Sequence, residues 1–439
     1  MAEKRPTVGI YTLGCKVNQY ESEAIAERLT EHGFSVLSPT EICDAYVINT
    51  CTVTAESDRK ARQFIRRAIK RSPKAYIAVT GCLAQTGSES LERIEGIDVI
   101  VGNTSKLLVA DRIAELYRCG VKNPAPEKII DSVDTAPFEK MAITRFDRTR
   151  AYVKIEDGCE NRCSYCAIPA ARGRIRSKSA ADVLAEVKSL TDGGCQEVVL
   201  TGIETASWGK DIFGKPMLGE LLERVDKIDG IGRVRLGSLD PSLIRPSFAE
   251  KIARLDSLTP HFHLSLQSGS SRILALMKRK YNSEQAMGAI ELLRERIKGV
   301  QFTTDVIVGF PDETDEDFRQ TCDFIDKAGF LTVHIFTYSK RDGTVAAGMK
   351  GQISEDVKTQ RLHMLEALVA KRRNEILTEI CGNTPVKQVL FETERDGVLY
   401  GHTAEFIEVA VKTDSPLRGE FADVRLTGTD GNICFGELI

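Results

Sequence analysis

The chain has 439 residues, of which 42% are hydrophobic and 28% charged, and its formal net charge is −3. At about 150 residues per domain, this length predicts about three domains and excludes a disordered, collagen-like or coiled-coil chain. No run of about 18 apolar residues is present and no apolar stretch follows the N-terminus, so we expect neither a membrane span nor a secretory signal. We therefore expect a cytoplasmic protein. Because the chain is not basic overall, any nucleic-acid binding should use local basic patches.

Residues 1–120 alternate strands and helices. Strands are predicted at 7–14, 45–50 and 75–80, and helices at 21–32 and 57–71. This order is typical of a doubly wound parallel α/β domain.

A cysteine follows each of these three strands, at Cys15, Cys51 and Cys82. Because the carboxyl ends of parallel strands meet at one edge of a sheet, we expect the three thiols to converge there. Burial of all three as ordinary core residues is the alternative.

Residues 121–145 contain prolines among polar residues and are predicted to be a linker. Residues 146–380 then repeat a strand–helix unit. Strands are predicted at 151–156, 196–201, 233–237, 261–266, 301–308 and 331–337, with helices near 179–192, 217–228, 243–255, 283–297, 315–328 and 355–379. These units are fewer than the eight of a closed barrel, so we predict a partial, open (β/α)6 barrel.

Residues 381–439 differ from the rest because their strands are short and separated by turns such as Asp396-Gly397 and Asp430-Gly431. This region predicts a small all-β barrel of OB-like size, a type often used on nucleic acid.

The strongest motif is Cys159-x3-Cys163-x2-Cys166, directly after the first barrel strand. Three thiolates on one tight loop suit three irons of a [4Fe–4S] cluster and leave the fourth iron open. A zinc site would need a fourth protein ligand or a hydrolytic water, and no histidine lies nearby in the sequence. The remaining cysteines (43, 119, 195, 322, 381 and 434) have no motif spacing and are assigned to core or surface.

The C-x3-C-x2-C spacing resembles that of the radical S-adenosylmethionine (SAM) superfamily. The resemblance implies that the open iron binds the amino and carboxylate groups of SAM, which one electron cleaves to a 5′-deoxyadenosyl radical. It places Tyr165 beside the cluster and further SAM contacts at the ends of barrel strands. The candidates there are Gly202, Glu204, Ser238, Gln267 and Asp305. A helix-cap role for Glu204 and ordinary hydrogen bonding for the others are the alternatives.

A narrower resemblance, covering almost the whole chain, is to the methylthiotransferases. Its landmarks are Thr12-Leu-Gly-Cys15-Lys-Val-Asn18, Asn49-Thr-Cys51-Thr-Val-Thr54, Thr80-Gly-Cys82, Ile168–Ser177, Leu264–Ser270 and Thr304–Pro311. The family resemblance implies that Cys15, Cys51 and Cys82 bind an auxiliary [4Fe–4S] cluster whose open iron carries sulfur. It also implies that the C-terminal barrel is a TRAM domain that binds tRNA.

The family has three main branches, which act on isopentenyladenosine 37 of tRNA, on N6-threonylcarbamoyladenosine 37 of tRNA, or on an aspartate of a ribosomal protein. Residues 13–19, 261–270 and 277–281 are similar to the threonylcarbamoyl branch. We therefore expect methylthiolation of C2 of that nucleoside in the anticodon loop. One SAM would donate the methyl group and another the radical, with an external electron donor and sulfur source. The other two substrates, and a cluster-bearing protein without SAM chemistry, are the alternatives.

Two segments depart from the family pattern. Residues 338–344 lack the expected proline-rich form, and Ala170-Ala171 replaces bulkier residues after the cluster loop.

RNA contacts are expected in two places. Residues 59–74 hold eight basic residues and no acid, so their helix offers a positive face to phosphates, unless it is simply a solvated surface. The candidates there are Arg59, Lys60, Arg62, Arg66, Arg67 and Lys70. In the acidic tail, His402 and Phe406 are candidates for stacking on bases, with ordinary strand packing as the alternative.

Overall fold

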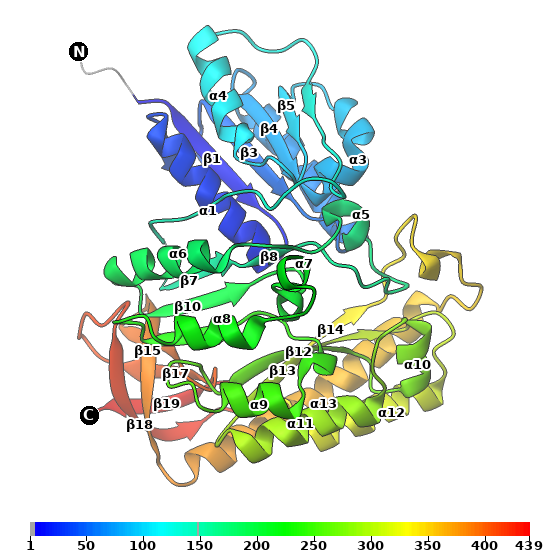
Figure 1. Cartoon of the computed structure of the whole chain (residues 1–439), viewed down its shortest axis with the longest axis vertical. Helices are drawn as coiled ribbons and strands as arrows, with labels where there is room; N and C mark the ends of the chain where they lie inside the picture. The colour runs from blue at the N-terminus through cyan, green and yellow to red at the C-terminus, as the bar shows by residue number, and fades with distance from the viewer. Residues whose placement is uncertain (1–4, 147–148) are drawn as a thin grey trace.

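The computed structural model describes residues 5–146 and 149–439 and has three parts (Figure 1). An N-terminal α/β domain lies at one end, a half-open barrel of strands and helices occupies the middle, and a small β-barrel lies against the side of the middle part. The predicted fold class is confirmed.

The N-terminal domain is built on a six-stranded parallel sheet in the order β2-β1-β3-β4-β5-β6. Its strands are β1 (Thr7–Thr12), β2 (Ser35–Leu37), β3 (Ala45–Thr50), β4 (Tyr76–Gly81), β5 (Val99–Val101) and β6 (Glu127–Ile129). Every residue of β3 and β4 is buried, as expected for strands covered on both faces. Three-residue strands such as β2 and β5 are too short to show a periodic pattern. The strand β6 lies within the predicted linker and extends the sheet.

Helices cover both faces of this sheet. Helices α1 (Lys16–Glu31) and α4 (Leu108–Cys119) pack on one face, and α2 (Ala55–Arg71) and α3 (Cys82–Glu92) on the other. Helix α1 begins five residues earlier than predicted, directly after Cys15. Helix α2 begins where the Thr54 side chain accepts a hydrogen bond from the Ser57 amide, a normal N-cap.

The middle part consists of two three-stranded parallel sheets, β11-β10-β7 and β12-β13-β14, linked by a bridge between Leu239 and Leu264. Its strands are β7 (Arg150–Lys154), β10 (Glu197–Thr201), β11 (Arg233–Leu236), β12 (His261–Gln267), β13 (Gln301–Val308) and β14 (Thr332–Thr337). The predicted helices are present as α6 (Ala180–Asp192), α8 (Leu218–Val225), α9 (Pro246–Ile252), α11 (Ser283–Arg296), α12 (Asp315–Ala328) and α13 (Glu355–Cys381). The loops add the short elements β8 (Glu156–Asp157), α5 (Ile168–Arg172), β9 (Arg176–Ser177), α7 (Lys210–Phe213) and α10 (Ser271–Leu276).

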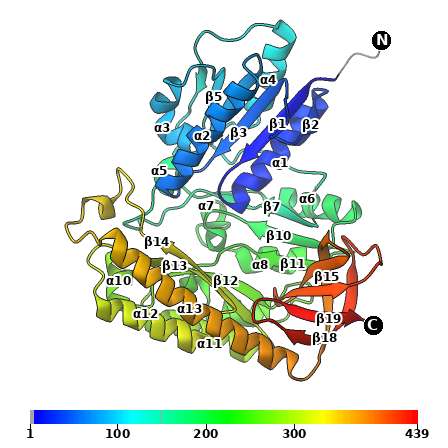
Figure 2. The ribbon, with the colours of Figure 1, turned by 180° about the vertical axis from the view of Figure 1, so that it is seen from behind.

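The barrel strands have an outer face toward the helices and an inner face without them. On β12, Phe262, Leu264 and Leu266 are buried in the main hydrophobic core beneath the helices. His261 and His263 alternate with them and therefore lie on the inner face. Helix α13 runs along the outside of β13 and β14 (Figure 2).

The C-terminal part is a closed five-stranded barrel in the order β15-β16-β17-β19-β18. Its strands are β15 (Val386–Arg395), β16 (Val398–Thr403), β17 (Glu408–Lys412), β18 (Phe421–Thr429) and β19 (Cys434–Leu438). It docks on residues at the starts of the middle strands. Arg150 pairs with Glu392 at 2.5 Å, and Arg233 donates to the Gln388 carbonyl at 2.7 Å. Within the described residues, no helix combines the length and the apolar character needed to cross a membrane.

Candidate active site

The turns that follow β1, β3 and β4 are joined by hydrogen bonds at one edge of the N-terminal sheet. The Asn18 amide group donates to the carbonyls of Leu13 (2.7 Å) and Thr50 (2.9 Å). The Thr50 hydroxyl donates to the Thr80 carbonyl at 2.6 Å and accepts from the Leu83 amide at 3.2 Å. These bonds hold the turns that carry Cys15, Cys51 and Cys82 beside one another.

The three thiols at this edge lie close enough to interact electrostatically. Cys51 and Cys82 are buried, and Cys15 is exposed. Burial raises the pKa of Cys51 to about 12, so this thiol is neutral and does not act as a free reactive thiolate. A metal that displaced its proton could still bind it.

The Cys159–Cys166 loop is fixed by backbone hydrogen bonds to its surroundings. The Cys159 amide donates to the Gly173 carbonyl at 3.0 Å, and the Cys166 amide to the Cys163 carbonyl at 3.1 Å. Between them, Ser164 donates through its amide to Met277 (3.1 Å) and through its hydroxyl to Leu276 (2.8 Å). These bonds tie both ends and the middle of the loop to the rest of the barrel.

Polar groups surround two of the loop sulfurs. The Arg279 guanidinium donates to the Cys163 sulfur at 3.2 Å, and the Asn161 amide donates to the Cys159 sulfur at 3.4 Å. The Cys159 thiol in turn donates to Glu204 at 3.2 Å. Donors directed at sulfur are one of the ways in which proteins set the potential of iron–sulfur clusters.

Arg172, a fully buried residue of α5, joins the two domains beside the cysteines. Its guanidinium donates to Asn18 (2.6 Å) and to Glu21 (2.9 Å) of the N-terminal domain, and to Asp157 (2.9 Å) of the barrel. Cys82 and Cys166 lie within electrostatic range of each other. One cysteine of each triad therefore lies near the contact between the two domains.

The second barrel loop carries two of the predicted SAM contacts. A β-carbon on Gly202 would lie 2.6 Å from a carboxylate oxygen of Glu156, so a larger residue there would displace the Glu156 side chain. Glu156 accepts the Glu204 amide at 2.8 Å, and its burial raises its pKa well above the ordinary value. The Glu204 carboxylate is then directed at the cluster loop, where the Asn161 side chain donates to it at 2.6 Å.

The other predicted SAM residues have different positions. Tyr165 packs on a small hydrophobic cluster, exposed Ser238 follows β11, and Gln267 ends β12 with φ 70°. Asp305 lies inside β13, where His263 contacts it at 3.2 Å. Asp305 is therefore on the predicted strand and engaged on the inner face of the barrel.

Arg279 is a residue of this site whose position the sequence did not predict. Besides Cys163, it contacts the Asp240 carboxylate at 2.9 Å and the Ser265 carbonyl at 3.0 Å. The only sequence signal was its place in the 277–281 segment.

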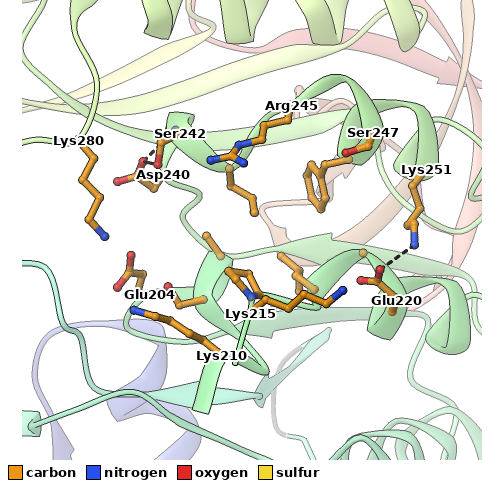
Figure 3. A pocket seen from close by; sticks show the side chains of 17 residues that line it. Glu204, Lys210, Lys215, Glu220, Asp240, Ser242, Arg245, Ser247, Lys251 and Lys280 are labelled. Atoms are coloured by element: carbon orange, nitrogen blue, oxygen red, sulfur yellow. Dashed lines mark hydrogen bonds and ion pairs between the residues drawn. The ribbon is translucent and has the colours of Figure 1, made fainter. Parts of the chain in front are cut away.

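A pocket of about 650 Å³ lies beside the second and third barrel loops (Figure 3). Glu204 lies at one end with Lys210 and Lys280, and Lys251 pairs with Glu220 at the other. The cations that line the pocket are Lys210, Lys215, Arg245, Lys251 and Lys280. They give the approach to the cluster loop a positive character.

The predicted RNA residues differ in their surroundings. On α2, Arg59, Lys60, Arg66, Arg67 and Lys70 are exposed, whereas Arg62 is half-buried and donates to Ser90 at 3.2 Å. Four of the exposed residues (Arg59, Arg66, Arg67 and Lys70) line a shallow depression together with Gln63.

His402 and Phe406 are engaged within the protein. The Phe406 ring stacks on His402 (centroids 4.5 Å apart) and on His261 of β12 (4.8 Å), and Arg235 lies over it at 4.8 Å. The two rings are thus packed against neighbouring strands, which is the alternative to the predicted stacking on bases. Base stacking by His402 and Phe406 has no support from this arrangement.

Both departures from the family pattern contact the N-terminal domain. Arg341 pairs with Asp58 at 2.7 Å and donates to Thr52 at 2.5 Å, directly beside Cys51. The Ala171 carbonyl accepts from Asn103 at 2.7 Å.

Two family models match the chain. The model of the radical SAM superfamily matches residues 153–325, and the model described as uncharacterized protein family UPF0004 matches residues 7–102.

The full length of the chain is similar to tRNA-modifying enzymes. It is 38% identical over 434 residues to the threonylcarbamoyladenosine tRNA methylthiotransferase MtaB of Bacillus subtilis, covering 96% of this chain and 93% of that one. It is 37% identical to the tRNA-2-methylthio-N(6)-dimethylallyladenosine synthase of Aquifex aeolicus, covering 98% of each.

A similar fold occurs among solved structures. The radical SAM methyltransferase TsrM of Kitasatospora setae, solved with cobalamin and a [4Fe-4S] cluster, has a TM-score of 0.56 at 17% identity and covers 78% of this chain and 74% of its own. At this identity, the likeness concerns the fold alone.

Proposed function

The chain belongs to the radical SAM tRNA methylthiotransferases, and we propose that it inserts a methylthio group at C2 of N6-threonylcarbamoyladenosine 37 in tRNA, in the cytoplasm. The observation that supports this proposal is the pair of cysteine triads, one after the strands of the N-terminal sheet and one after the first barrel strand, in two domains that the Arg172 contacts join. The substrate is taken from the relatives named for it. The relatives named for dimethylallyladenosine have comparable identity, so that nucleoside is the second candidate.

Membership of the radical SAM superfamily implies that the chain binds SAM and one [4Fe–4S] cluster. We assign the cluster to Cys159, Cys163 and Cys166, and a second, sulfur-carrying cluster to Cys15, Cys51 and Cys82. When bound, these groups supply one-electron chemistry able to activate an unreactive C–H bond, and sulfur for insertion. The donors directed at Cys159 and Cys163 support the first assignment, and the proximity of Cys15, Cys51 and Cys82 at one edge of the sheet supports the second.

The residues around the barrel triad have separate roles in this proposal. Arg279 places a positive charge beside Cys163 and ties the loop to Asp240. Glu204 presents a carboxylate beside the loop, suited to an amine such as that of methionine. Glu156 and Gly202 position Glu204 through the backbone of its own loop.

The exposed cations of α2 and those of the pocket in Figure 3 are our candidates for phosphate contacts. They lie on the N-terminal domain and on the barrel rather than on the acidic C-terminal barrel. Affinity for tRNA should therefore fall steeply with salt, even though the chain as a whole carries a net charge of −3.

The test uses purified protein with both clusters reconstituted, SAM, a reductant and a sulfide source. Anticodon stem-loops carrying threonylcarbamoyladenosine or isopentenyladenosine at position 37 are compared by nucleoside mass spectrometry. The proposal predicts the 2-methylthio product only from the first substrate. It predicts that Cys15→Ala still forms 5′-deoxyadenosine but no thiolated nucleoside. Full thiolation by Cys15→Ala would contradict the role of the auxiliary cluster, and thiolation of the second substrate alone would contradict the assigned nucleoside.

A further inference from the structure

Three polar side chains, His263, Asp305 and His334, lie near one another on the inner face of the barrel. Lys16 of α1 lies within electrostatic range of Asp305 and His334, and we refer to the four residues as the inner-face cluster. The two histidines and Asp305 come from three adjacent strands, and their nearest polar atoms all lie within 4.8 Å of one another. Asp305 is paired directly across from His334 in the β13–β14 ladder. The two imidazole rings are 5.8 Å apart.

Within this cluster, both ring nitrogens of His263 already have partners in the protein. One of its ring nitrogens contacts the Thr303 hydroxyl at 2.9 Å and the other contacts Asp305 at 3.2 Å. His334 is exposed on the neighbouring strand and forms no hydrogen bond with any described residue. A ligand that reaches the inner face would therefore meet an open imidazole at His334, beside a fixed His263–Asp305 pair.

Lys16 brings a positive charge from the N-terminal domain into this region. It is the first residue of α1, next to Cys15, and its ammonium lies within electrostatic range of Arg235, Arg150, Asp305 and Glu197. Glu197 is neutralised by Arg150 (2.6 Å) and Arg235 (2.8 Å). Lys16 itself makes no ion pair with any residue in the described part of the chain, so its charge is available to an anion.

An exposed aromatic ring lies nearer to the carboxyl end of its strand than this cluster does. Phe336 is 46% exposed and points to the same face of β14 as His334. It lies two residues, or about 7 Å, closer to the strand ends where the cluster loop lies. Such a ring is a platform on which a base can stack.

The substituent on N6 of threonylcarbamoyladenosine carries a carboxylate, a hydroxyl and a urea group, whereas isopentenyl is a hydrocarbon. Building on the function proposed above, we propose that the inner-face cluster binds this anionic substituent. Lys16 pairs with the carboxylate, His334 hydrogen-bonds a polar group of the substituent, and the base stacks on Phe336. The nucleotide is thereby held with its substituent deep in the barrel and its ring toward the cysteine triads.

A divalent metal ion is the other ligand that two histidines and a carboxylate can hold. The surroundings disfavour it. The only carboxylate among these three side chains, Asp305, is already in contact with His263. Nearby Arg150 and Arg235 are paired with Glu197, so Lys16 is, of the residues that the structure describes here, the cation left for a ligand. An unpaired positive charge beside the site favours an anion over a cation.

The test measures binding by full-length protein that carries its clusters, with SAM present and reductant absent, so that no turnover occurs. Fluorescence anisotropy compares anticodon stem-loops with unmodified adenosine and with threonylcarbamoyladenosine at position 37. The variants are Lys16→Met and His334→Phe. Lys298→Met and His363→Phe, at exposed positions outside the inner face, are the matched controls.

We expect the wild type and both controls to bind the threonylcarbamoyl stem-loop about tenfold or more tightly than the unmodified one, as one charge-assisted hydrogen bond allows. Lys16→Met should abolish most of this preference and His334→Phe part of it, while affinity for the unmodified stem-loop stays unchanged. The inference is wrong if both variants keep the full preference for the threonylcarbamoyl stem-loop. It is also wrong if the wild type has no such preference yet thiolates this substrate. In both cases the proposed function stands. If the wild type neither prefers nor thiolates the substrate, the proposed function itself fails. A metal ion that co-purifies with the wild type and is absent from His334→Phe would also overturn the inference.

Discussion

Gly14 lies directly against Cys51. A β-carbon on Gly14 would be 2.6 Å from both the β-carbon and the sulfur of Cys51, and the backbone at Gly14 has φ +95°. The turn that carries Cys15 therefore reaches the second cysteine only because residue 14 has no side chain.

Gly14→Ala should consequently disrupt the N-terminal cysteine triad and leave the barrel triad intact. We expect iron and sulfide content after reconstitution to fall by about half, with 5′-deoxyadenosine formation retained. Gly33→Ala is the matched control, because Gly33 also has a positive φ (+90°) but no atom within 4 Å of its missing β-carbon. Equal iron loss in the two variants would point to backbone strain rather than to contact with Cys51.

Glu21 pairs with three buried cations at the interface between the N-terminal domain and the barrel, two of which also pair with Asp157. Lys106, Lys154 and Arg172 all contact it, and although burial alone would raise the pKa of Glu21, these cations lower it well below its ordinary value. Glu21→Gln should cost about 3–5 kcal/mol, because it leaves buried charges unpaired. Urea unfolding measures this cost, with exposed Glu95→Gln as the control. A loss no larger than that of the control would contradict the interpretation.

Glu197, the first residue of β10, makes the free energy of unfolding depend on pH. Burial would raise its pKa, but Arg235 and Arg150 lower it to about 2. Because the native pKa lies below the unfolded value of about 4.3, the stabilisation is complete above the unfolded pKa and is lost as pH falls toward 2. Ionised Glu197 contributes a total of about 3 kcal/mol to the free energy of unfolding. About 1 kcal/mol of this contribution should be lost between pH 6 and pH 3.5. Urea unfolding of cluster-free protein should show this loss in the wild type relative to Glu197→Gln. A difference between the two proteins that does not change with pH would refute it.

Arg279 should set the potential of the barrel cluster through its contact with Cys163. Arg279→Met removes a positive charge and a hydrogen bond to sulfur, so the midpoint potential should become more negative. A redox titration followed by electron paramagnetic resonance measures the shift, with exposed Arg254→Met as the control. An unchanged potential at full iron content would show that Arg279 only supports the loop.

The sequence predicted the elements well because their periodic patterns are long and local. It also predicted that Cys15, Cys51 and Cys82 meet, since the rule that parallel strands end at one edge needs no knowledge of side-chain contacts. It did not reveal the location of Lys16, which depends on how α1 docks beside the barrel. Nor could it show that His334 meets His263, because their strands are separated by about 70 residues and are brought together only by the β12-β13-β14 order.

The RNA residues illustrate a second limit of sequence reasoning. Composition identified the exposed basic face of α2, which exists in the structure. It could not indicate that Phe406 is stacked between His402 and His261, since that packing depends on where the C-terminal barrel docks.

The measurement that tests the central claim most directly is nucleoside mass spectrometry of tRNA from cells with and without this protein. We predict that the 2-methylthio form of threonylcarbamoyladenosine disappears when the protein is absent and that its unthiolated precursor accumulates, with restoration by the wild type and not by Cys15→Ala. Unchanged levels of both nucleosides, or loss of the methylthio form of isopentenyladenosine instead, would contradict it.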